Sequence, residues 1–385
     1  MKLKSVQSLL TKLIGFDTTS HKSNRDCIAF IQNYLDNLGI KSEIIANDVG
    51  NKACLWATVG PQEKAGIVLA GHTDVVPVDG QTWTSDPFTL TERNEKLFGR
   101  GACDMKGFIA CVLVTIAECD REKLLRPLHL AFTYDEEISM EGAERLTNYL
   151  KNQKVKPAWV WIGEPTELHI VHAHKGVAAY LTNFTGVPAH SAQPDQGLNA
   201  ISLGAEFIDI IQHVAEQKKS NPFSRSRFIP PYTTFNLGTI KGGTAENIIA
   251  EHCELLWQIR SHPGEEAIAL LAEVEAMASH ALNPRLAKFP NTAAMRTCTC
   301  FDIPPLMPTQ DNPGEKTLAR LTGRDEFEAV SFATEAGFFQ KLGTHVVVCG
   351  PGSIDQAHKA DEYIAKTEII ACMGLLKQML EEKVM

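Results

Sequence analysis

Three short apolar segments in the first half of the chain are each followed directly by side chains that carry oxygen or nitrogen donor atoms. The segments are residues 67–71, 128–134 and 159–163, and the side chains that follow are His72 and Asp74, then Asp135, Glu136 and Glu137, and then Glu164. The carboxyl ends of parallel strands in an α/β sheet face the ligand-binding edge. Imidazole and carboxylate groups are common ligands of divalent metals. The pattern therefore predicts a metal site at this edge of an α/β sheet.

Length, charge and apolar runs limit the class of protein. The 385 residues suffice for two domains, and a net charge of −9 argues against a general nucleic-acid binder. No apolar run approaches the ~20 residues of a membrane span, and the N-terminal segment lacks the cleavage site of a signal peptide. Ten scattered cysteines then fit reduced thiols. We expect a cytoplasmic protein without nucleic-acid or membrane partners.

The order of the predicted elements divides the chain into two domains. Helix and strand patterns alternate up to about residue 175, as in an α/β sheet covered by helices. A compact α+β set follows, and the first rhythm then returns with a strand at 346–349 and a closing helix at 367–382. This predicts one α/β domain made of residues 1–175 and 303–385, with residues 176–302 inserted as a second domain.

His72 and Asp74 stand two residues apart, so an extended backbone projects both side chains to one side. In one interpretation His72 binds a divalent ion through one ring nitrogen, while Asp74 accepts the N–H of the other. In the alternative, loop carbonyls satisfy an ordinary histidine. This motif alone does not decide between the two.

Asp104 directly precedes an apolar segment with helical spacing. It is interpreted either as an N-cap or as a carboxylate whose oxygens bridge two metal ions about 3.5–4 Å apart, and the two roles are compatible. Cys103 beside it is interpreted as a small apolar filler and not as a zinc ligand.

The acidic triplet 135–137 follows a predicted buried strand. One interpretation is a solvated helix start, because acids favour the positive end of the helix dipole. In the other, Glu137 binds one ion while Glu136 takes a proton from water. Glu164 at a strand tip and His358 after the strand at 346–349 are the remaining predicted ligands.

Six motifs together resemble those of the dizinc aminoacylase/carboxypeptidase-type metallopeptidase family. They are AGHTDVVP, GRGACDMKG, DEE, GEPT, AHKG and GPGSIDQAH, which occur in that family's order and span essentially the whole chain. The resemblance implies a zinc-peptidase-like catalytic domain with a mixed central sheet flanked by helices. It also implies an inserted α+β lid or dimerisation domain with an antiparallel sheet, and two Zn²⁺ per subunit, with Co²⁺ or Mn²⁺ as alternative metals.

The resemblance further implies which residues hold the two ions. Asp104 bridges them, His72 and Glu164 complete one site, and Glu137 and His358 complete the other. No cysteine ligand is required, which suits a hydrolytic site with an open position for water.

Three residues are implied in catalysis. Glu136 acts as general base and later as general acid, and Asp74 orients His72. His190, in the inserted domain, meets the oxyanion in the active site of the partner subunit; the alternative for His190 is an exposed loop residue. Because such inserted domains pair across a two-fold axis, we expect a homodimer.

The implied reaction is hydrolysis of a small N-acyl amino acid, N²-acetyl-L-ornithine, to L-ornithine and acetate in arginine biosynthesis. Arg260 and Asn247 are predicted to bind the α-carboxylate, with backbone N–H groups of Gly352 and Ser353. Glu335 is predicted to meet the δ-ammonium group. Each of these residues has a plain alternative as a surface, loop or turn residue.

Other activities share the same metal chemistry. They are succinyl-diaminopimelate desuccinylase, a general N-acyl-amino-acid aminoacylase, a dipeptidase, and an inactive metal-binding scaffold. The named motifs hold no additional arginine for the second carboxylate of a succinyl group, which favours an acetyl substrate. The presence of every expected ligand and of Glu136 argues against a scaffold. Glu164, in place of aspartate, resembles the deacylase branch more than the peptidase branch.

Overall fold

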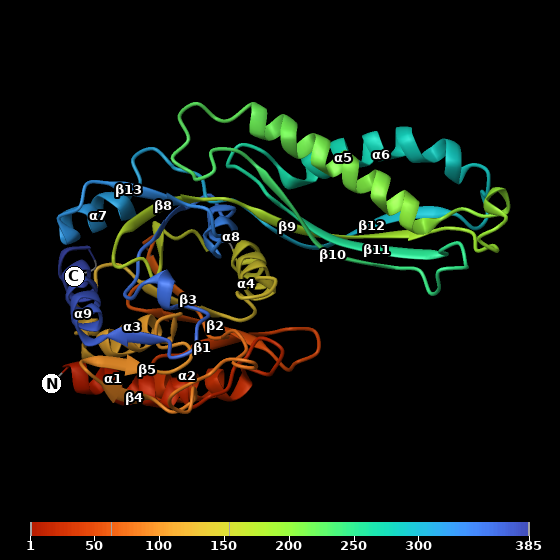
Figure 1. Ribbon diagram of the computed structural model, residues 1–385. Coiled ribbons are helices and arrows are strands. Elements are labelled where there is room, and N and C mark those ends of the chain that lie inside the picture. Colours follow the sequence, from red (N-terminus) through yellow and green to blue (C-terminus); the bar gives the residue numbers. More distant parts are fainter. Residues whose placement is uncertain (1, 63, 154, 384–385) are drawn as a thin grey trace. The chain divides into compact units, whose positions relative to one another are not determined.

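The computed structural model describes residues 2–62, 64–153 and 155–383, which fold into two compact units (Figure 1). The first unit runs to His172 and adds Pro308–Glu328 and the chain from Thr334 onward. The second unit consists of Ala173–Met307 and Ala329–Ala333. The predicted inserted domain, 176–302, lies inside this second unit. The short piece from Ala329 was not expected.

The first unit is built on an eight-stranded mixed sheet with the order β1-β2-β6-β3-β7-β14-β8-β13. Its strands are β1 Ser42–Ala46, β2 Ala53–Val59, β3 Ile67–His72, β6 Leu128–Thr133, β7 Trp159–Ile162, β8 Ile170–His174, β13 Phe327–Val330 and β14 His345–Val348. The central strands β6, β3, β7 and β14 are parallel, whereas β1 and β2 are antiparallel. β3, β6 and β7 are buried throughout because helices cover both faces of the sheet. The predicted α/β class with a mixed central sheet is confirmed.

Helices and a small sheet complete the first unit. The helices are α1 Lys2–Ile14, α2 Arg25–Asn37, α3 Lys106–Glu118, α4 Glu141–Asn152, α7 Pro313–Thr322, α8 Ala336–Gln340 and α9 Lys366–Lys383, with 3-10 turns at Arg121–Lys123 and Ile354–Gln356. The small sheet has the order β15-β5-β4, with β4 Thr91–Arg93, β5 Lys96–Phe98 and β15 Tyr363–Ala365. Helix α3 packs against α1, α9 and β3, while α4 packs on the other side of the sheet (Figure 1). α3 is therefore buried along most of its length.

The second unit is an antiparallel sheet with two long helices. The sheet order is β10-β11-β9-β12, with β9 Val177–Thr185, β10 Thr234–Gly242, β11 His252–Arg260 and β12 Ala294–Ile303. The helices are α5 Ala200–Ser220 and α6 Ala267–Leu286, and a 3-10 turn spans Pro194–Gln196. Alternate residues of β11 are buried beneath these helices, as expected for a sheet covered on one face. The predicted antiparallel sheet is confirmed.

All ten cysteines are free thiols, and eight of them are at least partly buried. Within the described residues, no helix combines the length and the apolar character needed to cross a membrane.

Candidate metal centre

The parallel strands bring the predicted donors to one edge of the sheet. β3 ends at His72, which lies opposite Thr133, the last residue of β6. The chain that leaves β6 carries Glu136 and Glu137, and Glu164 follows β7 on the other side of β3. Because β3 lies between β6 and β7, their carboxyl ends place these side chains together.

Close packing of α3 on the sheet positions Glu164. Gly163 precedes it, and a Cβ atom at Gly163 would lie 2.1 Å from the Phe108 ring of α3. Only glycine permits this approach. Glu164 therefore directly follows a residue that packs against the first turn of a buried helix.

Asp104 belongs to the turn before α3. The helix begins at Lys106, its N-cap is Met105, and no side chain caps it. The N-cap interpretation of Asp104 is therefore wrong, because its carboxylate faces two histidines and not the helix amides. Cys103 is buried and its Sγ donates to the Ser353 carbonyl at 3.3 Å, as a packed thiol and not as a ligand.

The Asp104 carboxylate lies between two histidines. Its Oδ1 is 3.0 Å from His72 Nε2, and its Oδ2 is 3.3 Å from His358 Nε2. Glu164 Oε1 is 3.9 Å from the first histidine nitrogen, and Glu137 Oε2 is 2.9 Å from the second. The donors thus form two groups that share Asp104.

The donor set fits divalent cations. The donor atoms of His72, Glu136 and Glu164 lie within 4.8 Å of one another, as do those of His72, Asp104 and Glu137. Glu164 Oε1 is buried without a hydrogen-bond partner among the described residues, which is costly unless a cation meets it. Nitrogen and oxygen donors of this kind suit zinc, cobalt and manganese.

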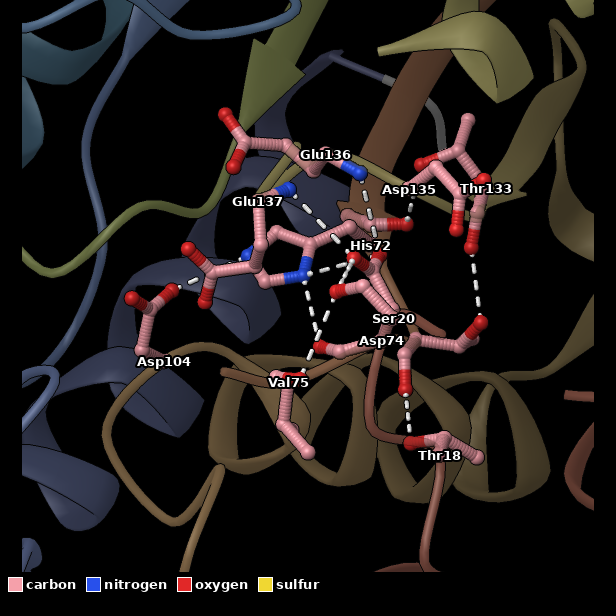
Figure 2. A network of polar contacts seen from close by, with 12 residues as sticks. Thr18, Ser20, His72, Asp74, Val75, Asp104, Thr133, Asp135, Glu136 and Glu137 are labelled. Atoms are coloured by element: carbon pink, nitrogen blue, oxygen red, sulfur yellow. Dashed lines mark hydrogen bonds and ion pairs between the residues drawn. The ribbon is translucent and has the colours of Figure 1, made fainter. Parts of the chain in front are cut away.

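Asp74 connects His72 with the loop of the acidic triplet (Figure 2). His72 Nδ1 is 2.9 Å from the main-chain carbonyl of Asp74 and 3.5 Å from its carboxylate. The carboxylate accepts the amide N–H of Glu136 at 3.1 Å, that of Glu137 at 3.3 Å, and the Ser20 hydroxyl at 2.7 Å. Because Nδ1 of His72 bonds to the Asp74 carbonyl, Nε2 of His72 is left to face the other donor side chains. The Asp74 carboxylate meanwhile fixes the backbone of Glu136 and Glu137.

Burial makes the glutamates of the site hard to ionise. Burial and the charge of Glu164 raise the pKa of Glu136 well above its ordinary value. Burial and the charge of Asp104 do the same for Glu164, and raise the pKa of Glu137 to about 7. The three glutamates are therefore stable in this site when protons or bound cations offset their negative charges.

Hydrogen bonds to the histidines act in the opposite direction on Asp104. Burial disfavours its charge, but bonds from His358 and His72 outweigh burial and lower its pKa. The bonds that His358 donates to Asp104 and Glu137 raise the pKa of His358 to about 10, although burial opposes this. For His72, burial opposes protonation, yet Asp104 and Asp74 raise its pKa overall. The Asp104 carboxylate thus favours positive charge on both histidines.

A buried ion pair beside the site was not found by sequence reasoning. Lys52 Nζ lies 2.7 Å from Asp135 Oδ2 and also donates to the Ser20 carbonyl. Asp135 adopts a left-handed backbone with a φ of 59°, which turns the chain from β6 into the loop of the glutamates. Lys52 and Asp135 are 83 residues apart in the sequence. Nothing in the residues around a single lysine at the start of a strand indicates such a distant partner. A second pair, Arg100 with Glu362, was missed for the same reason.

In the loop after β14, two glycine amides already donate to side chains of the protein. The Gly352 amide donates to Glu368 Oε2 at 3.2 Å, and the Gly350 amide donates to Thr166 Oγ1 at 3.1 Å. The predicted use of the Gly352 amide for a substrate carboxylate stays a prediction, and it would require the amide to leave the Glu368 carboxylate. Ser353, next in the chain, pairs with Thr166 in a β-bridge.

Three predicted residues belong to the second unit. His190 is exposed and forms a β-bridge with Ile248, which places it next to Asn247, itself exposed. Arg260 ends β11, and partial burial lowers its pKa. Lys175 lies close enough to Arg260 for burial and this positive charge to lower the Lys175 pKa to about 8.

Glu335 lies in the first unit and is 1% exposed, so its interpretation as a surface helix residue is wrong. Neither carboxylate oxygen has a hydrogen-bond partner among the described residues. Burial raises the pKa of Glu335 to about 7; the neighbouring Thr133 and His72 lower it, and Asp74 raises it further. Glu335 is therefore a buried acid beside the donor cluster that has no ion-pair partner among the described residues.

Known proteins with similar sequences match nearly the whole chain. The model of the family "Peptidase family M20/M25/M40" matches residues 68–382. The acetylornithine deacetylase of Photorhabdus laumondii is 36% identical over 367 residues, which cover 95% of this chain and 92% of that protein. The acetylornithine deacetylase of Proteus mirabilis is 36% identical over 366 residues, with the same coverage of both chains.

Solved structures share the fold at low sequence identity. The aminopeptidase PepT of Bacillus cereus has a TM-score of 0.73 and 18% identity, covering 99% of this chain and 98% of that one. A dinuclear metal-binding M20 peptidase of Bacillus subtilis has a TM-score of 0.65 and 16% identity, covering 99% of each chain. With the matched family model and relatives above 30% identity, these findings show that the chain belongs to the peptidase family M20/M25/M40 and is a metallohydrolase.

Proposed function

We propose that the protein is a dinuclear zinc amidohydrolase that converts N²-acetyl-L-ornithine to L-ornithine and acetate. The observation that carries the proposal is the pair of donor groups that share the Asp104 carboxylate. Relatives with 36% identity over 95% of the chain are acetylornithine deacetylases, which supports the choice of substrate. On this proposal the enzyme serves arginine biosynthesis in the cytoplasm.

The five predicted ligands divide into two sets. His72 and Glu164 would hold one ion, Glu137 and His358 the other, and Asp104 would bridge them. The unpartnered buried oxygen of Glu164 and the short contacts of both histidines with carboxylates support this division. Two zinc ions, when bound, supply Lewis acidity that acidifies water and polarises the acyl carbonyl. Cobalt or manganese would suit the same donors.

Glu136 is the proposed proton carrier. Its backbone is fixed by the Asp74 carboxylate, and its own carboxylate has no hydrogen-bond partner among the described residues. Burial and neighbouring acids raise its pKa, which suits a group that must take a proton from water and later return it. In the proposed reaction, water attacks the acyl carbon, and Glu136 passes the proton to the departing amine nitrogen.

Substrate recognition is proposed for four residues. Glu335 would pair with the δ-ammonium of ornithine, which is supported by a buried carboxylate without a partner. Asn247, Arg260 and Ser353 would bind the α-carboxylate; Arg260 is a partly buried cation for which no acidic partner is found among the described residues. His190 of the partner subunit would donate to the acyl oxygen in a homodimer, which is supported by its exposure.

The test compares hydrolysis of N²-acetyl-L-ornithine, N-succinyl-diaminopimelate and N-acetyl-L-methionine by protein of known metal content, with Glu136→Ala beside it. We expect metal-dependent activity that favours acetylornithine and falls by at least about 10²-fold in the variant. Preference for another acyl amino acid would reject the substrate but keep the metal chemistry. Full activity of Glu136→Ala would reject the proton carrier. A monodisperse monomer that stays active on dilution would reject the dimer and the role of His190.

A further inference from the structure

The carboxylate of Glu362 fills the inside of the turn that leads to Asp104. Glu362 is 1% exposed and uses both oxygens. Oε1 accepts the amide N–H groups of Cys103 at 2.8 Å and of Asp104 at 3.0 Å. Oε2 accepts the amide of Gly101 at 3.0 Å and Nη1 of Arg100 at 2.8 Å. Four bonds to one carboxylate fix this turn in a single arrangement.

The same ion pair also reaches the segment that carries His358. Arg100 donates to the carbonyl of Lys359 at 3.3 Å and to Oε1 of Gln81 at 2.6 Å. Gln81 in turn donates to the carbonyl of His358 at 2.9 Å. The His358 side chain is 53% exposed, so packing alone does not hold it. Its backbone depends on this polar network.

The other metal position is built differently. His72 ends β3, and Glu164 follows β7, so the ladder between these parallel strands sets their separation. Glu362 forms none of its bonds with either residue. Asp104 belongs to both positions, but only the second position also depends on Glu362 through the segment of His358. A change at Glu362 should therefore weaken the second position more than the first.

We propose that Glu362 is a positioning residue that holds Asp104 and His358 against each other and thereby sets the second metal position, that of Glu137 and His358. This inference rests on the proposed two-metal site. Replacing a residue that holds metal ligands in place through hydrogen bonds typically changes the metal affinity about 10- to 100-fold.

The test is the variant Glu362→Gln, studied by metal titration of protein stripped with a chelator. Glutamine keeps the shape of the side chain, but its N–H₂ group cannot accept a hydrogen bond. In one orientation this group would face the amides of Cys103 and Asp104, and in the other it would face Arg100, so donor meets donor in both. We expect zinc at the second position to bind about 10- to 100-fold less tightly, and zinc at the first position to weaken by much less. Metal analysis at limiting zinc should then find one ion per chain in place of two.

Two further variants make the result interpretable. Asp361→Asn changes the neighbouring acid, whose carboxylate accepts from Thr84 and lies 3.9 Å from Arg93 but makes none of the bonds of Glu362, and it should keep both ions. His358→Ala removes the second position directly, so its remaining zinc affinity identifies the first. Glu362→Asp keeps the charge with a shorter reach and should weaken the second ion by less than Glu362→Gln does.

Melting of each metal-free variant, followed by circular dichroism, separates positioning from general stability. Equal weakening of both ions, or two ions bound by Glu362→Gln as tightly as before, would overturn the inference. If Glu362→Gln does not fold, Glu362→Asp carries the same test. A single ion in the unaltered protein would instead reject the proposed two-metal site.

Discussion

Replacing Glu335 with glutamine removes a buried acid that has no ion-pair partner among the described residues, and it should stabilise the metal-free protein increasingly as the pH rises. The pKa of Glu335 is raised by burial from an ordinary value of 4.5 to about 7. A raised pKa means that the acid is tolerated while protonated, and that stability is lost as the pH rises from about 4.5 through about 7. Glutamine stays neutral throughout this range.

The size of the effect follows from this difference in pKa. Linkage gives a cost of ionising Glu335 of about 1 kcal/mol at pH 5 and about 3 kcal/mol at pH 8. The advantage of Glu335→Gln should therefore grow by about 2 kcal/mol between these pH values, or about 5 °C in melting temperature for a unit of this size. A constant cost of packing the amide group would cancel in this comparison.

The assay is thermal melting of both proteins after chelation, at several pH values from 5 to 8. Glu381→Gln, at an exposed position of α9, is the matched control and should show no such trend. An advantage of Glu335→Gln that is the same at every pH would refute the reasoning. An advantage that shrinks with pH would mean that a cation of the protein already pairs with Glu335.

In the same variant, the proposed substrate role predicts a higher KM for acetylornithine but not for acetylmethionine.

Three other changes have defined outcomes. Lys52→Met should lower the free energy of unfolding by about 3–5 kcal/mol in urea denaturation, because it leaves Asp135 buried without its cation; an effect below about 1 kcal/mol would contradict this. His358→Ala should reduce bound zinc from two ions to one by elemental analysis, and retention of both would reject His358 as a ligand. Chelation should lower the melting temperature more at pH 8 than at pH 6, because Glu137, with its pKa raised to about 7, must then ionise without a bound cation; equal shifts would argue against this.

Local sequence patterns predict well those site residues that lie at the ends of buried strands. Buried parallel strands are continuous apolar runs, so their ends, and with them His72 and Glu164, are visible in the sequence. The two-domain division could be anticipated from the change of rhythm near residue 175. The three-residue strands β4, β5 and β15 are too short to show any periodicity.

The supporting contacts could not be predicted, because they join distant segments. Arg100 and Glu362 are 262 residues apart, and each alone resembles an ordinary surface charge. The burial of Glu335 depends on how α8 packs against α4 and β14, which no local pattern encodes. Gly352 illustrates the reverse case: a glycine-rich turn suggested free amides, but the carboxylate of Glu368 lies close enough to bind one.

The pairing of β14 with β7 has a consequence for the order in which the protein matures. These strands are neighbours, although the whole second unit is synthesised between them. His72, Asp104, Glu137 and Glu164 leave the ribosome early, whereas His358 follows only after β14. Pairing across such a sequence separation is slow, because a long loop must close first. A chain interrupted before β14 would thus hold four of the five proposed ligands, and the final one would arrive only once the rest of the molecule exists.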